Sequence, residues 1–327
     1  MPAVVITTEP LYHKPGPHVD MLTRAGFEIR YASQAVVATE RETIEAVAGL
    51  PAVIAGGELY TEAVFAASPA LRVVSRYGVG FDRVDVEAAT RHGVVVTITP
   101  QGNHASVAEH ALALMLAVTR SIVRNDVDAR RGVWLKEPLM PLRGKTLGII
   151  GYGRVGRSVA TRAAVFGLEV LAFDKYVTDQ SVDGAELVEF DELLSRSDIV
   201  SVHAPLTTET RGMIDQSVLT RMKRGCVLVN TARGELVVED DLIAALHSGQ
   251  VAGAGLDVLC AEPPPRDHPL FTFDNVVISP HVAANDTQAL DDMGVEAAQN
   301  LIDLSRGDWP GHAVLNNEVK ERWNWEG

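Results

Sequence analysis

Residues 146–174 read TLGIIGYGRVGRSVATRAAVFGLEVLAFD, and this stretch decides the fold. An apolar run that ends at Ile150 leads into a glycine-rich turn, and a second apolar run ends at Asp174. Apolar residues recur at helical spacing between the two runs, at Val155, Val159, Ala163 and Phe166. The pattern predicts a strand, a tight turn, a helix and a second strand, which is a βαβ unit.

The turn Gly151-Tyr-Gly153-Arg-Val-Gly156 has glycines where a dinucleotide site needs them. Gly151 allows a sharp turn, Gly153 lets the backbone approach a pyrophosphate, and Gly156 lets the helix pack closely on the strand. The pyrophosphate would bind the free amides at the helix N-terminus, beside Arg154 and Val155. The alternative is a structural turn that binds nothing, and the flanking pattern favours the dinucleotide site.

Asp174 follows the second strand, where the dinucleotide fingerprint has an acid. Its carboxylate would accept hydrogen bonds from both hydroxyls of the adenosine ribose and would repel a 2′-phosphate. The sequence therefore favours NAD over NADP, although the neighbouring Lys175 leaves some tolerance for NADP.

Composition excludes several classes of protein. The 327 residues are enough for two domains, and 46% are apolar and 22% charged, as in ordinary globular proteins. A formal net charge of −14 argues against nucleic-acid binding. The two cysteines, Cys226 and Cys260, have no metal-ligand or disulfide spacing, and no signal-peptide pattern opens the chain. We therefore expect a cytoplasmic protein without a metal.

Strands alternate with helices along the whole chain, which predicts an α/β fold with mostly parallel, doubly wound sheets. The strands are expected at 4–7, 27–31, 52–55, 71–75, 94–98, 147–150, 170–173, 199–203, 227–230, 255–258 and 276–279. One long buried helix is expected from Ser106 to about Arg124. In the second half, polar residues follow successive strands, and ligands bind at the carboxyl ends of strands in such sheets.

Three segments in that half, Asn230-Thr-Ala-Arg-Gly234, Asp257–Pro263 and Ser279-Pro-His281-Val-Ala-Ala284, carry a family resemblance. Together with the glycine turn, Ser75–Asp82 and Ser106–His110, they resemble the D-isomer-specific 2-hydroxyacid dehydrogenases, in the phosphoglycerate dehydrogenase-like branch. The resemblance runs nearly end to end.

The resemblance implies a catalytic set of Arg233, Glu262 and His281. Reduction of a 2-keto acid needs a hydride and a proton, and an imidazolium at His281 can supply the proton. Glu262 would orient that ring and favour its charged form, and the forked guanidinium of Arg233 would bind the substrate carboxylate.

Further contacts are implied by the same resemblance. Ala204, Thr231 and Ala284 would bind the cofactor, and Asp257 would bind the nicotinamide carboxamide. His203 is expected to shape the adenine pocket. The substrate loop would be Tyr77-Gly78-Val79-Gly80, whose consecutive amides could receive a carboxylate, although a plain tight turn is the alternative reading of these glycines.

The resemblance also implies a discontinuous architecture. Residues 1–101 and 286–327 would form a smaller, flavodoxin-like α/β substrate domain, with a helix from Asp286 to Leu304. Residues 102–285 would form a Rossmann-type NAD-binding domain. Members of the family usually form homodimers through this domain and its long helix, and the apolar faces from Val107 to Ile122 permit such a contact.

The expected function is therefore NAD-dependent interconversion of a small 2-keto acid and its D-2-hydroxy acid. Phosphoglycerate dehydrogenase activity, phosphite oxidation and an NADH-sensing, co-repressor-like role are the alternatives. Formate dehydrogenases pair their histidine with Gln, so Glu262 argues against them. Glu58 follows the third strand, where phosphoglycerate dehydrogenases commonly have a basic residue, and we expect its carboxylate to disfavour a phosphorylated substrate.

Overall fold

The computed structural model describes residues 2–34, 37, 39–177 and 184–325. The chain folds into two compact units, one of Met1–Asn103 with Asp286–Gly327 and one of His104–Asn285. The sequence places the corresponding boundaries after residues 101 and 285. Each unit is built on its own parallel sheet.

The sheet of the second unit has the strand order β12-β11-β10-β9-β6-β7-β8, and every pairing in it is parallel. Its strands are β6 (Thr146–Ile150), β7 (Glu169–Phe173), β8 (Glu186–Leu187), β9 (Ile199–Val202), β10 (Cys226–Asn230), β11 (Val251–Leu256) and β12 (Val276–Ile278). Numbered within this unit the order is 7-6-5-4-1-2-3, which is the Rossmann order extended by one strand. The predicted fold class is confirmed here.

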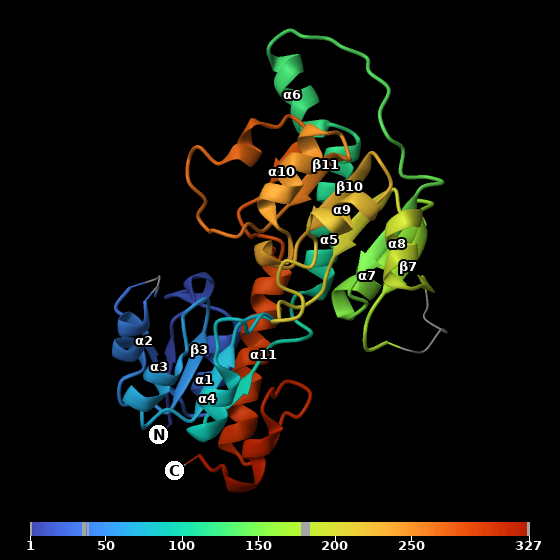
Figure 1. The fold of residues 1–327 in the computed structure, drawn as a ribbon. Coiled ribbons are helices and arrows are strands. Elements are labelled where there is room, and N and C mark those ends of the chain that lie inside the picture. Colours follow the sequence, from blue (N-terminus) through green and yellow to red (C-terminus); the bar gives the residue numbers. More distant parts are fainter. Residues whose placement is uncertain (1, 35–36, 38, 178–183, 326–327) are drawn as a thin grey trace. The chain divides into compact units, whose positions relative to one another are not determined.

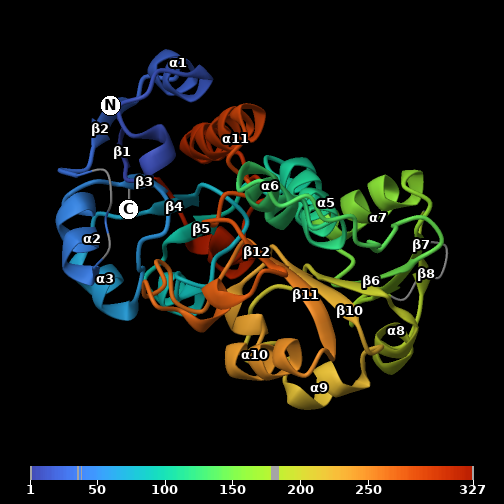
Figure 2. The ribbon, with the colours of Figure 1, turned by 90° about the horizontal axis from the view of Figure 1, so that it is seen from above.

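Helices cover both faces of this sheet (Figure 2). One face carries α5 (His104–Thr119) and α7 (Arg154–Val165), and the other carries α8 (Phe190–Arg196), α9 (Gln216–Arg221) and α10 (Glu239–His247). A sheet that is covered on both faces needs strands that are apolar on both sides, and β9 and β10 are buried at every residue. This burial explains the continuous apolar runs in the sequence.

The helix expected from Ser106 to Arg124 is wrong at its C-terminal end. Helix α5 ends at Thr119, and a separate helix, α6 (Ile122–Arg130), follows at an angle of 55°. Ser121 lies between them with φ of 48°, in the left-handed region that interrupts a right-handed helix. No single helix of the described residues is long and apolar enough to cross a membrane, and only this bent pair reaches that length and composition when both helices are counted.

The first unit has a sheet of order β2-β1-β3-β4-β5, the flavodoxin order, again with parallel pairing. Its strands are β1 (Ala3–Ile6), β2 (Glu28–Tyr31), β3 (Ala52–Ala55), β4 (Val73–Arg76) and β5 (Val95–Thr97). Its helices are α1 (Pro17–Arg24), α2 (Glu40–Val47), α3 (Glu62–Ala67), α4 (Val86–Arg91) and α11 (Thr287–Ser305). Helices α1 and α11 pack together on one face of the sheet, and α2, α3 and α4 cover the other (Figure 1).

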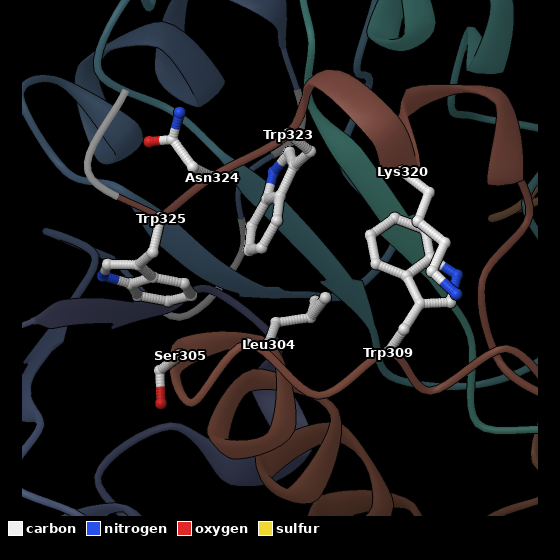
Figure 3. A pocket seen from close by; sticks show the side chains of 8 residues that line it. Leu304, Ser305, Trp309, Lys320, Trp323, Asn324 and Trp325 are labelled. Atoms are coloured by element: carbon white, nitrogen blue, oxygen red, sulfur yellow. The ribbon is translucent and has the colours of Figure 1, made fainter.

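Tryptophans of the C-terminal segment pack against the end of α11 (Figure 3). The Trp323 Nε1 donates to the Arg72 carbonyl at 3.2 Å, and Trp325 meets Phe27 edge-on at 5.7 Å between ring centroids. Beside them lies an open pocket of about 260 Å³. None of the predicted site residues lines it, so we take this cluster as packing that fastens the segment to the first unit.

Candidate active site

The glycine turn has the geometry that the sequence predicts. Gly151 adopts φ of 94°, and a Cβ there would lie 2.6 Å from the Ala204 amide nitrogen. A Cβ at Gly156 would lie 2.2 Å from the Gly151 carbonyl oxygen, whereas one at Gly153 would meet nothing within 4 Å. The first and third glycines are therefore needed for packing, and the second leaves an open approach to the N-terminus of α7.

The start of α7 has free hydrogen-bond donors. Gly153 is the N-cap and offers no side chain, so no side-chain acceptor caps the first turn, and Arg154 is exposed there while Val155 is half-buried. An uncapped helix N-terminus attracts anions through its amides and its dipole. This end of the helix therefore fits a pyrophosphate.

Asp174 follows β7 and lies directly beside the turn. Its Oδ2 accepts a hydrogen bond from the Tyr152 amide and its Oδ1 accepts one from the Tyr176 amide, both at 2.8 Å. Each carboxylate oxygen has a second lone pair, so these bonds orient the group and leave it able to accept from ribose hydroxyls. Lys175 forms an exposed ion pair with Glu209 at 2.5 Å between Nζ and Oε2.

Two further strand ends present groups that fit a dinucleotide. The hydroxyl of Thr231, after β10, is buried and has no hydrogen-bond partner among the described residues. Such an orphaned hydroxyl calls for a ligand or water as its partner. After β9, the His203 Nε2 lies 2.8 Å from the Ser201 Oγ, and burial lowers the pKa of His203 to about 4, so its ring is neutral at physiological pH. Ala204 follows, packed on Gly151.

Arg233 is presented by a tight turn at the end of β10. The Asn230 side chain donates to the Arg233 carbonyl at 2.8 Å and accepts from the Ala232 amide at 3.0 Å. A Cβ at Gly234 would lie 2.1 Å from the Leu259 carbonyl carbon, so only glycine lets this turn pack on the segment that leads to Glu262. The sequence therefore brings the guanidinium and the carboxylate into one region, and the charge of Arg233 acts on Glu262.

Glu262 and His281 form the central pair of the site. The His281 Nδ1 lies 2.7 Å from the Glu262 Oε2, and the Glu262 Oε1 accepts from the Leu259 amide at 3.0 Å. The His281 side chain is 47% exposed, and its Nε2 has no hydrogen-bond partner among the described residues. The carboxylate thus fixes one ring nitrogen and leaves the other open to a substrate.

The charge of Glu262 is set by its neighbours. Partial burial acts to raise the pKa of Glu262, but the hydrogen bond and charge of His281 and the Leu259 amide hold it below its ordinary value. Glu262 is therefore ionised at neutral pH.

The segment that carries His281 wraps around Asp257. The Val282 amide donates to the Asp257 Oδ1 at 3.0 Å, and the Ala283 amide donates to its Oδ2 at 2.8 Å. His281 itself has φ of 53°, a left-handed conformation that is uncommon outside glycine. Asp257, expected as a ligand of the carboxamide, thus also holds the segment that carries His281, which continues into the half-buried Ala284.

The expected substrate loop lies in the first unit and is described there by itself. Tyr77 is buried, and its hydroxyl donates to the Leu290 carbonyl of α11 at 3.0 Å, so it anchors the loop. Gly78 has φ of 118°, and its amide already donates to the Thr99 Oγ1 at 2.8 Å. The expectation that the Gly78 amide is open to a substrate is wrong, whereas the amides of Val79 and Gly80 have no acceptor among the described residues.

Sequence reasoning missed the residues that support the His281–Glu262 pair. Ser279 and His110 bond to Asp257 and to each other, and the Leu259 amide holds Glu262. Ser279 and His110 both lie inside the quoted motifs, but 169 positions separate them. Only the fold brings them together.

Comparison with known proteins identifies the family. Residues 112–283 match the family model described as D-isomer specific 2-hydroxyacid dehydrogenase, NAD binding domain. The chain is 39% identical over 308 residues to a D-3-phosphoglycerate dehydrogenase of Archaeoglobus fulgidus, covering 93% of this chain but 57% of that protein. It is 43% identical over 266 residues to a glyoxylate reductase of Thermofilum pendens, covering 78% of each.

A solved structure extends the comparison to the whole fold. The D-lactate dehydrogenase of Aquifex aeolicus, complexed with NAD and lactic acid, superposes with a TM-score of 0.83 at 26% identity, covering 96% of this chain and 98% of that one. The matched model covers more than half of the chain and includes the glycine turn, Asp174 and the central pair. The chain therefore belongs to the D-isomer specific 2-hydroxyacid dehydrogenase family, and its second unit is the NAD-binding domain of that family.

Proposed function

We propose that this protein is an NAD-dependent enzyme that interconverts a small 2-keto acid and its D-2-hydroxy acid. The observation that carries the proposal is the His281–Glu262 pair, with 2.7 Å between the Nδ1 and Oε2 atoms and the Nε2 open. In this pair, Glu262 orients His281 as a proton donor at the carboxyl edge of the sheet in the NAD-binding domain. The names of the D-lactate dehydrogenase and glyoxylate reductase relatives point to the same chemistry.

The residues divide the reaction between them. NADH, when bound, supplies the hydride that the carbonyl carbon accepts. The Nε2 of His281 gives its proton to the carbonyl oxygen, so that a hydroxyl forms and the ring becomes neutral. Glu262 stabilises the charged ring before the transfer, and Arg233 holds the substrate carboxylate with its forked guanidinium. In the oxidative direction His281 takes the hydroxyl proton back.

We propose an unphosphorylated substrate. Glu58 is only 2% exposed, so it does not meet a substrate directly as the sequence suggested. It lies near Arg76, the cation that precedes the Tyr77–Gly80 loop. Burial raises the pKa of Glu58, and the charge of Arg76 acts to lower it. When Glu58 is ionised, its charge beside that cation reduces the positive potential available to a second anionic group. This argument favours glyoxylate, pyruvate or hydroxypyruvate over phosphohydroxypyruvate.

NADH oxidation at neutral pH tests the function. Glyoxylate, pyruvate, hydroxypyruvate, phenylpyruvate and phosphohydroxypyruvate would be compared, with NADPH in parallel. We expect turnover of at least one unphosphorylated keto acid, with NADH preferred. Tight NADH binding without any turnover would contradict the enzyme and favour a sensing role. A preference for phosphohydroxypyruvate over every other acid would overturn the substrate proposal and favour phosphoglycerate dehydrogenase activity.

We also propose a homodimer formed through α6 and the loop that follows it. Six of the exposed large apolar residues belong to this segment, namely Ile122, Val123, Val127, Val133, Trp134 and Leu135. Trp134 is 77% exposed, and the segment stands clear of the sheet of its own unit (Figure 1). Exposed large apolar side chains gathered in one segment are typical of subunit contacts. Light scattering should give a dimer, and Trp134→Asp should shift it to monomer. A monomeric wild-type protein would contradict the proposal.

A further inference from the structure

The buried carboxylate of Asp257 has more donors than a single ligand contact needs. Its side chain is fully buried at the end of β11. The Oδ1 accepts from the Ser279 hydroxyl at 2.6 Å as well as from the Val282 amide, and the Oδ2 accepts from the Ala283 amide. Ser279 and Ala283 flank His281, so this one carboxylate holds the catalytic segment at both ends.

Helix α5 adds a fourth donor. The Nε2 of His110 lies 2.7 Å from the Ser279 Oγ and 3.3 Å from the Asp257 Oδ1. An ionised carboxylate only accepts hydrogen bonds, so the single hydroxyl proton of Ser279 points to Asp257. The Ser279 oxygen must then accept from His110, which requires the proton of the His110 ring to be on Nε2. The donor and the acceptor of each hydrogen bond from His110 through Ser279 to Asp257 are thus fixed.

We propose that His110 is a positioning residue for the catalytic His281, acting through Ser279 and Asp257. This inference rests on the proposed function. His281 has a left-handed backbone conformation, which is unfavourable for a residue other than glycine and persists only where the surroundings impose it. A series of hydrogen bonds imposes this conformation. It runs from His110 through Ser279 to Asp257, which in turn accepts from the amides of Val282 and Ala283.

Charge supports the same arrangement. Burial acts to raise the pKa of Asp257, but the bonds from His110, Ser279 and the two amides outweigh it and keep the group ionised. Without the His110 side chain, the Ser279 oxygen no longer accepts a hydrogen bond, and the Ser279 hydroxyl can rotate away from the Asp257 carboxylate. His281 would then lose its alignment with a substrate, and misplacement by about 1 Å can cost up to ~10²-fold in rate.

The experiment is a double-mutant cycle on kcat with His110→Leu, Ser279→Ala and both together. We expect each single variant to lower kcat about tenfold or more and the double variant to be hardly worse than either, because one chain is cut in each case. KM for the keto acid should change much less. His110→Gln, whose amide can donate from a similar position, should recover most of the lost kcat. Glu109→Leu, the neighbouring exposed position on α5, is the control and should leave kcat unchanged.

Additive losses in the double variant, or a normal kcat in His110→Leu, would overturn the proposal. NMR of the histidine ring nitrogens gives a readout that is independent of turnover. The His281 resonances should move in His110→Leu and Ser279→Ala but not in Glu109→Leu. If the wild type turns over no keto acid, the proposed function fails, whereas unmoved His281 resonances would sink the positioning role alone.

Discussion

Two glutamates, one in each unit, follow strands of parallel sheets and have opposite environments. Glu262 in the second unit is partly exposed and paired with His281, and its pKa is lowered. Glu58 in the first unit is almost fully buried, and burial raises its pKa despite the nearby charge of Arg76. The carboxyl edge of a parallel sheet therefore does not by itself make a catalytic acid or base. Under the proposed function, the edge that carries the active site differs in that its carboxylate is paired with a histidine whose second ring nitrogen is left open.

The largest expected effect tests that open atom. His281→Ala removes the proton donor, and general acid catalysis is typically worth ~10²–10⁴, so kcat should fall by that factor. NADH affinity, measured by fluorescence titration, should stay close to the wild-type value because the ring is not part of the glycine turn. A kcat near normal would remove His281 from the mechanism and with it the contrast between the two glutamates.

A smaller effect is expected at the cofactor end of the same sheet. Asp174→Ala should weaken NADH binding about tenfold and reduce the advantage of NADH over NADPH, because the acceptor for the ribose hydroxyls and the repulsion of a 2′-phosphate are both lost. Dissociation constants for the two cofactors would show the change. If the ratio of the two constants is the same as in the wild type, another residue sets the cofactor preference.

Much of the second unit could be predicted from sequence because its signals are local. The turn at Gly151–Gly156, the acid at Asp174 and the apolar runs of the strands each depend on neighbouring residues. The break at Ser121 escaped prediction because the apolar pattern runs on past it to Ile122 and Val123, and strand β8 escaped because it has only two residues. The links from His110 to Ser279 and from Gly78 to Thr99 escaped because their partners lie 169 and 21 positions apart in the sequence.

The raised pKa of Glu58 should be visible in how the melting temperature of the protein depends on pH. Because the folded-state pKa of Glu58 is raised, the folded protein holds this proton more tightly than the unfolded chain, and stability falls as pH rises above the ordinary glutamate value of 4.5. The side chain that Glu58→Gln introduces stays neutral at every pH. The melting temperature of this variant should therefore rise relative to that of the wild type as pH increases from about 4 toward the raised pKa. A constant difference between the two proteins across this range would refute the raised pKa.

The smallest effect is expected at the substrate loop. Tyr77→Phe removes only the hydrogen bond to the Leu290 carbonyl, which is worth about 1 kcal/mol, and should lower the melting temperature by a few degrees. KM for the keto acid should change little, because the hydroxyl is held by α11. A large increase in KM with unchanged stability would instead give Tyr77 a direct role in binding.

The most direct measurement is a crystal structure of the protein with NADH and oxamate, an unreactive analogue of a 2-keto acid. The proposed mechanism predicts the oxamate carboxylate on the Arg233 guanidinium and the amide-bearing carbonyl oxygen within hydrogen-bond distance of the His281 Nε2, with Glu262 still bound to Nδ1. An oxamate bound away from these groups, with NADH in the glycine turn, would contradict the assignment of this edge as the active site.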